Sequence, residues 1–357
     1  MTGTNNSGGP ANQAYRPIII KALQKNKVAI DVILTFQNGM SFEGEISVSA
    51  DNVTVSSYAY QNTFVDHDSS NVQISDYTML PAGAVYHEDD RREVHMISSP
   101  NKSEIASAVA GMVHISNLQF DTPTMDQVTI TGQILSDKIL EDFGLPACGN
   151  VKFWDQTTSA AQGTAFLVAQ DMVATAGHCV DNINLDDWRF VFNYNKHSDH
   201  SGQVTVDKRF VVEADRIVER GSGGNDYALV KLKTTPPGVY SLSLNLSGQV
   251  NVDDGLFTVG HPMGLPKKIA DGGRVREASD SHVFECDLDT FGGNSGSPVL
   301  LESTREVVGI LVRGAADFVE SNGCMTEATY SDPSEGGEYC TRIKFIIDAL
   351  RSPDLYV

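Results

Sequence analysis

The chain has 357 residues, of which 41% are hydrophobic, so its length favours two domains with buried cores. Its formal net charge of −20 repels phosphate backbones and argues against a general nucleic-acid-binding protein. No stretch approaches the roughly 18 consecutive apolar residues of a membrane span, and the polar N-terminus lacks the apolar core of a signal peptide. We therefore expect a cytoplasmic protein with no membrane partner.

The five cysteines are widely spaced, which is not typical of a secreted disulfide framework. They form no CxxC pair, so no zinc site is expected, and neither another metal nor a cofactor is predicted. Cys324 and Cys340 could pair in an oxidising compartment, but we expect free thiols.

Residues 1–14 are rich in Gly, Asn and Ser and are expected to form a flexible leader. A short apolar helix is predicted from Pro17. Three strands follow, at 28–36, 40–48 and 53–55, and the Asn-Gly pair before residue 40 is a strong hairpin signal. Gly44 is expected to bend the second strand sharply.

This pattern resembles the Hfq/Sm-like family, through KALQKNKV at 21–28, FQNG at 36–39 and FEGEI at 42–46. The resemblance covers about 15–81 and implies a small Sm-like β-barrel with an N-terminal helix. It also implies a homo-oligomeric ring of six or seven subunits and often RNA binding. The family's Lys-His pair is missing from 64–81, so RNA binding stays open. Another small β-barrel used as a docking module remains the alternative.

Residues 82–145 are interpreted as a linker or as a regulatory segment that packs on the next domain. The charge run 87–93 is typical of solvated surface. Helical character is expected at 102–113, a strand at 128–131 and a helix at 134–143.

Three later motifs carry residues suited to nucleophilic catalysis. His178 ends a run of apolar and small residues, Asp226 comes just before an apolar strand, and Ser295 lies in the glycine-rich stretch FGGNSGSP. A serine hydroxyl needs an imidazole to take its proton, and the imidazole needs a carboxylate to fix its tautomer. Flanking glycines let the chain turn tightly around the serine. We predict that the N–H groups of Gly293 and Ser295 form the oxyanion hole.

Residues 148–351 resemble the chymotrypsin/trypsin superfamily, and LDTFGGNSGSPV at 288–299 looks most like its bacterial glutamyl-endopeptidase-like branch. The resemblance implies a mostly β domain at 146–357, with a double β-barrel and the triad in the cleft between barrels. Residues 338–350 fit the C-terminal helix that closes this fold.

Two departures from the animal enzymes bear on mechanism. Asn294 stands where those enzymes have an Asp that pairs with a freshly cut N-terminus, so activation by that cleavage is not expected. The strand before His178 starts with Gln162-Gly163 in place of a cysteine, so Cys179 is expected to stay a free thiol.

The resemblance also names substrate-binding positions, which are Asp289, Thr290, Arg313 and Gly314. Asp289 corresponds to the pocket floor of trypsin and favours cleavage after a basic residue. Arg313 would either point inward and neutralise Asp289 or point outward and favour an acidic residue elsewhere in the substrate. The glutamyl-endopeptidase-like relatives keep cleavage after acidic residues open.

The sequence thus predicts an intracellular serine endopeptidase that works through an acyl-enzyme and is assembled by an Sm-like domain. Its substrate would be a protein, and bacterial stress or defence is a plausible setting. The alternatives are an RNA-responsive binding protein with a regulated protease output, and an inactive protease fold used as a scaffold.

Overall fold

The computed structural model describes 28–35, 41–48 and 53–61 as backbone, and 84–86, 88–120, 126–159, 161–196, 203–221, 224–330 and 336–352 with side chains. The chain divides into two compact units, Met1–Pro81 and Ala82–Val357. None of the described helices has the length and hydrophobicity needed to cross a membrane.

The first unit contains a three-stranded antiparallel sheet in the order β1 (Val28–Thr35), β2 (Ser41–Val48) and β3 (Val53–Gln61). The three predicted strands are confirmed, and the third runs further than expected. The register between β2 and β3 shifts between Glu43 and Gly44, where the glycine predicted a bend. The predicted helix at Pro17, the Asn38-Gly39 turn and the 64–81 motif lie outside the described residues.

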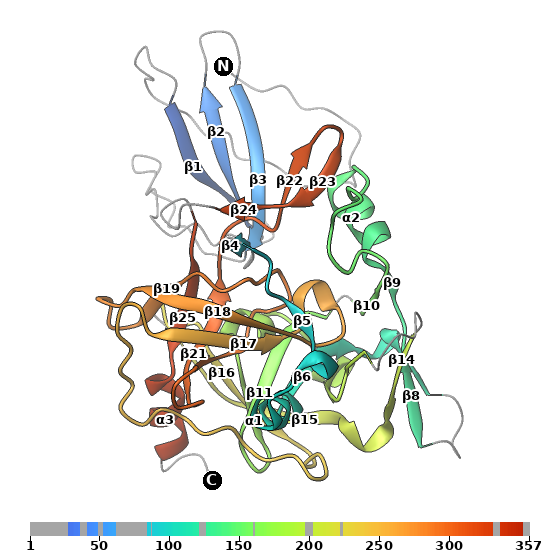
Figure 1. The fold of residues 1–357 in the computed structure, drawn as a ribbon, viewed down its shortest axis with the longest axis vertical. Helices are drawn as coiled ribbons and strands as arrows, with labels where there is room; N and C mark the ends of the chain where they lie inside the picture. The colour runs from blue at the N-terminus through green and yellow to red at the C-terminus, as the bar shows by residue number, and fades with distance from the viewer. Residues whose placement is uncertain are drawn as a thin grey trace. The chain divides into compact units, whose positions relative to one another are not determined.

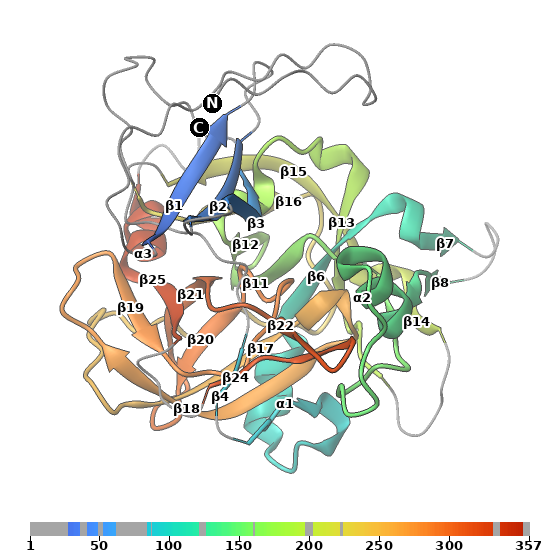
Figure 2. The same ribbon diagram turned by 90° about the horizontal axis from the view of Figure 1, so that it is seen from above.

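The second unit is built around two six-stranded antiparallel barrels (Figures 1 and 2). This confirms the mostly β, double-barrel expectation. The strands of the first barrel, in spatial order, are β11 (Gly163–Ala169), β12 (Met172–Thr175), β16 (Ala228–Leu232), β15 (Val211–Arg220), β13 (Trp188–Phe192) and β6 (Val109–His114). Those of the second are β17 (Gly255–Gly260), β20 (Pro298–Leu301), β21 (Val307–Arg313), β25 (Glu338–Arg342), β19 (Val283–Cys286) and β18 (Lys268–Glu277).

Strand β6 corrects the interpretation of 82–145 as a linker. Helix α1 (Pro100–Ser107) ends before the predicted boundary. Strand β6 begins after Ala108, and its residues 109–112 pair with β11 while 110–114 pair with β13. Small residues at 106–111 give the segment helical character. In the barrel their small side chains leave room for another part of the same chain, which approaches closely at this point. A Cβ on Gly111 would lie 3.3 Å from the ring of His261 in the second barrel.

The C-terminal region also differs from the prediction of a helix over 338–350. Its first residues form β25, which closes the second barrel by pairing with β19 and β21. Helix α3 begins only at Lys344 and ends at Arg351. The apolar positions Ile346 and Ile347 are buried by α3 as its spacing predicted.

Smaller elements surround the barrels. Helix α2 (Leu135–Phe143) is confirmed to within one residue of its prediction, and Phe143 packs edge-on against Phe318. The other strands are β4 (Val85–Tyr86), β5 (Arg92–Glu93), β7 (Leu118–Phe120), β8 (Gln127–Ile130), β9 (Gln133–Ile134), β10 (Thr157–Thr158), β14 (Val204–Asp207), β22 (Phe318–Ser321), β23 (Cys324–Glu327) and β24 (Thr329–Tyr330).

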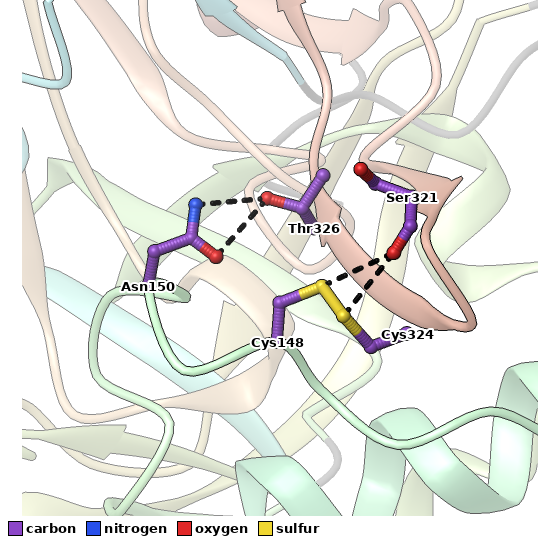
Figure 3. The surroundings of a disulfide bond; sticks show 5 residues. All are labelled: Cys148, Asn150, Ser321, Cys324 and Thr326. Carbon is purple, nitrogen blue, oxygen red and sulfur yellow. Dashed lines mark hydrogen bonds between the residues drawn. A yellow bond between two sulfur atoms is a disulfide. The ribbon is translucent and has the colours of Figure 1, made fainter.

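One disulfide joins Cys148 to Cys324 in the hairpin β22–β23 (Figure 3). This bond contradicts the expectation of free thiols for Cys148 and Cys324. Cys340, the other partner considered for Cys324, is a buried free thiol whose Sγ lies 3.7 Å from that of Cys286. Backbone bonds explain the pairing, because Met325 donates to Pro146 and accepts from Cys148, which sets residue 148 beside the hairpin. A disulfide is more typical of an oxidising compartment, so the cysteines no longer favour a reducing one.

Candidate active site

His178 and Asp226 meet because their strands are neighbours in the first barrel. His178 lies in a 3-10 turn directly after β12, and Asp226 lies just before β16, which pairs with β12. The Oδ2 of Asp226 is 2.7 Å from the ring Nδ1 of His178, and its Oδ1 accepts a 2.9 Å hydrogen bond from the His178 backbone N–H. The carboxylate therefore fixes both the ring and the chain that carries it.

The electrostatics of this pair favour an ionised carboxylate. Burial raises the pKa of Asp226, but the hydrogen bonds and charge of His178 outweigh it and hold the pKa below its usual value. Burial lowers the pKa of His178, but Cys179 and the Asp226 carboxylate bring the pKa well above its usual value. His178 must lose this proton before it can accept one from a nucleophile.

Ser295 lies in a tight turn between two glycines in left-handed backbone. Gly293 has a φ of 92° and Gly296 a φ of 89°, which side chains rarely adopt. A Cβ on Gly296 would lie 2.0 Å from the carbonyl oxygen of Thr164, and one on Gly293 would lie 2.5 Å from that of His261. The glycines are therefore required by close packing as well as by backbone conformation.

The turn that carries Ser295 is bound to the barrel that carries His178. The Ser295 carbonyl accepts a 2.8 Å hydrogen bond from Thr164 N–H in β11, and the thiol of Cys179 approaches it at 3.6 Å. Cys179 is a buried free thiol, as predicted. Among the described residues, no hydrogen bond joins Ser295 to His178, and none engages the N–H groups of Gly293 and Ser295. These donors are thus open to another acceptor.

Residues 163–310 match the trypsin-like peptidase domain, and this span contains His178, Asp226 and Ser295. The chain carries a trypsin-like peptidase domain. It is therefore a hydrolase of the serine protease class. No curated protein matches the chain in sequence.

Many solved structures match the chain, and three of them show how low the similarity is. Rv3671c from M. tuberculosis H37Rv, in an inactive form, is 13% identical with a TM-score of 0.41, over 75% of this chain and 95% of that one. A Glu endopeptidase in complex with MPD is 16% identical with a TM-score of 0.41, over 75% and 100%. The serine endoprotease from Yersinia pestis is 13% identical with a TM-score of 0.37, over 61% and 58%.

The peptidase domain holds the four predicted substrate-binding residues in different surroundings. Both carboxylate oxygens of Asp289 accept backbone N–H groups, from Tyr86 at 2.6 Å and from Asp90 at 2.8 Å. Thr290 is fully buried, and the Arg313 guanidinium lies 4.5 Å from the ring centre of Tyr339. Gly314 lies against a carboxyl group that the sequence did not single out, as described below.

The sequence also missed the residues that support the loop before Ser295. Asp317 accepts a 2.9 Å hydrogen bond from the N–H of Gly292, and burial raises the pKa of Asp317 to about 7. Arg91 lies 3.9 Å above the ring of Phe291 and forms ion pairs with Asp89 and Glu327. Arg91 is only 3% exposed, although its charge run indicated solvated surface. No local signal identifies it, because Glu327 is 236 residues away.

Proposed function

We propose that the chain is a serine endopeptidase in which Ser295 is the nucleophile, His178 the general base and Asp226 the residue that orients His178. The observation that carries this is the pair of hydrogen bonds that Asp226 accepts from His178, beside a serine turn anchored on the same barrel. A carboxylate on Nδ1 leaves the Nε2 of His178 as the atom that can accept a proton.

In the proposed reaction, the Ser295 hydroxyl oxygen attacks the peptide carbonyl carbon while His178 Nε2 takes its proton. The negative charge that forms on the carbonyl oxygen is stabilised by the N–H groups of Gly293 and Ser295. His178 then gives the proton to the leaving amine, and the peptide bond breaks to leave an acyl ester on Ser295. A water molecule, deprotonated by His178, attacks that ester. The acyl group leaves as a carboxylic acid, and His178 returns the proton to the Ser295 oxygen.

We further propose cleavage after a basic residue. The support is the acidic surroundings of the loop that precedes Ser295, where Asp317 and Glu338 are both buried. Such a concentration of carboxyl groups favours a cationic side chain over an acidic one.

The decisive experiment is a fluorogenic peptide panel with basic, acidic and aromatic residues before the cleaved bond, assayed on wild type and Ser295→Ala. Hydrolysis by wild type alone is expected, together with labelling of wild type by a fluorophosphonate. A folded wild-type protein that hydrolyses no peptide and is not labelled would refute the proposal. Labelling without hydrolysis would refute only the choice of peptides.

For residues 15–81 we propose an Sm-like assembly role that joins six or seven copies of the chain. The three-stranded meander β1–β3, with its shifted register at Gly44, supports this. Assembly would raise the local concentration of active sites. Light scattering of the full chain is expected to give the mass of a hexamer or heptamer, and a monomeric mass would refute the assembly role without touching the protease.

A further inference from the structure

Besides Asp289, a second acidic residue, Glu338, lies beside the loop 290–295 that carries Ser295, although it is more than 40 positions away in the sequence. Glu338 begins β25 and is fully buried. Its carboxyl group accepts a 2.6 Å hydrogen bond from the Thr290 hydroxyl and a 3.3 Å bond from the Tyr86 hydroxyl. The backbone N–H of Ala315 lies at 3.4 Å.

These contacts place the carboxyl group between two segments of the chain. The first runs from Thr290 to Ser295. The other is the end of β21, which is bound to the serine turn by Gly296 N–H to Leu311 O at 2.7 Å and Leu311 N–H to Ser297 O at 3.0 Å. A Cβ on Gly314 would lie 2.0 and 2.2 Å from the two carboxyl oxygens of Glu338. The carboxyl group therefore packs directly against Gly314, and any larger residue at position 314 would clash with it.

Asp289 has a different environment, although it precedes Thr290 directly. Its two oxygens are held by the N–H groups of Tyr86 and Asp90, in the segment that passes beside it. Ala84 forms a β-bridge with Thr290, so this segment is fixed beside the loop. Thr290 and Gly314 therefore both contact the Glu338 carboxyl group, whereas the Asp289 carboxylate is held by the backbone N–H groups of Tyr86 and Asp90.

The partners of Glu338 carry no positive charge. Within the part of the chain described here, no ion pair involves Glu338, and its hydrogen-bond donors are two hydroxyl groups and one backbone N–H. Burial raises the pKa of Glu338 well above its usual value, and Cys286 and Asp317 add to this. A buried carboxyl group without a counter-ion is costly to ionise. A cationic side chain of a substrate would supply the positive charge that stabilises the ionised form.

We propose that Glu338, and not Asp289, is the specificity-determining residue of this peptidase, and that it selects a lysine or arginine before the scissile bond. The proposal rests on the proposed endopeptidase function and assigns its substrate class to one carboxyl group. Thr290 and Tyr86 act as positioning residues that hold this group by their hydroxyls.

The test compares Glu338→Gln with Asp289→Asn as a matched control, since each change replaces one buried ionisable carboxyl group with an amide of the same shape. For each protein, kcat/KM is measured on paired peptides with arginine or leucine before the cleaved bond and is normalised to the fraction labelled by a fluorophosphonate. We expect Glu338→Gln to lower the arginine-to-leucine ratio by about 100-fold. The ratio is expected to stay within about threefold in Asp289→Asn, because a general loss of activity affects both peptides alike.

The outcomes separate the two proposals. An unchanged ratio in Glu338→Gln overturns the role of Glu338, and so does a collapse of the ratio in Asp289→Asn, whether or not Glu338→Gln folds. A wild-type enzyme that is labelled but does not prefer arginine overturns the inference alone. A wild-type protein that is neither labelled nor active overturns the endopeptidase function itself.

Discussion

The carboxylate of Asp226 binds His178 twice, through Oδ2 at the ring Nδ1 and through Oδ1 at the backbone N–H. Asp226→Asn keeps the shape but can present an N–H to Nδ1, which favours the wrong tautomer of His178. We expect kcat/KM to fall by about 10,000-fold at neutral pH. Peptide hydrolysis is measured beside Ser295→Ala, and activity of Asp226→Asn within tenfold of wild type would contradict the role assigned to Asp226.

The pH dependence of hydrolysis reports the pKa of His178, which its pairing with Asp226 shifts. Cys179 and Asp226 raise the pKa of His178 against the opposing effect of burial. Because only neutral His178 accepts the serine proton, the rate must rise as pH increases through this pKa. We expect the acidic limb of kcat/KM to have its midpoint above the ordinary histidine value of about 6.5. A midpoint below that value would show that burial dominates the pKa.

The glycine after the nucleophile is expected to be irreplaceable. Gly296→Ala places a Cβ 2.0 Å from Thr164 O in left-handed backbone, whereas Gly144→Ala meets nothing within 4 Å at a φ of 73°. The control therefore carries only the backbone strain, about 1 kcal/mol. Urea denaturation should show Gly296→Ala to be less stable than Gly144→Ala by more than about 2 kcal/mol. Equal losses would mean that the turn relaxes without cost.

Motifs formed by neighbouring residues were predictable, and partnerships across the chain were not. His178, Asp226 and Ser295 each lie in a local pattern of strand, turn and glycine, so the sequence alone was enough to propose them as a triad. The burial of Arg91 depends on Glu327 and Phe291, which are more than 190 positions away. Likewise the position of Glu338 depends on how β25 pairs, and its residues fit a helix equally well. The Cys148–Cys324 pairing also follows from backbone register, which cysteine spacing does not contain.

The stability of the peptidase domain should depend on pH through Asp317. Burial raises the folded-state pKa of Asp317 from an ordinary 3.8 to about 7, so its contribution to stability is present below pH 4 and is lost as pH rises to about 7. The loss is at most about 4 kcal/mol.

Asp317→Asn cannot ionise and does not lose this contribution. In a Ser295→Ala background, which prevents self-cleavage, we expect urea denaturation to show the Asp317→Asn variant gaining on its parent between pH 5 and pH 8. A difference between the two proteins that does not change with pH would contradict the raised pKa of Asp317.

The disulfide is expected to support activity as well as stability. It joins residues 176 positions apart, and removing such a bridge costs about 2–5 kcal/mol. The hairpin that it anchors is preceded by Asp317, which accepts a hydrogen bond from Gly292 N–H. The hairpin ends at Glu327, which pairs with Arg91 at the face of the Phe291 ring. Loosening the hairpin should therefore disturb the loop that carries the proposed oxyanion donors.

We expect the double variant Cys148→Ser with Cys324→Ser to lose stability and to show a lower kcat with a smaller change in KM. Dithiothreitol should reproduce both effects in wild type and have none in the double variant, which serves as the control for reduction of other groups. The buried thiols of Cys179, Cys286 and Cys340 are already reduced, so they do not respond to the reagent. Full activity of the double variant would show that the hairpin holds its place without the bridge, through the backbone bonds between Met325 and residues 146–148.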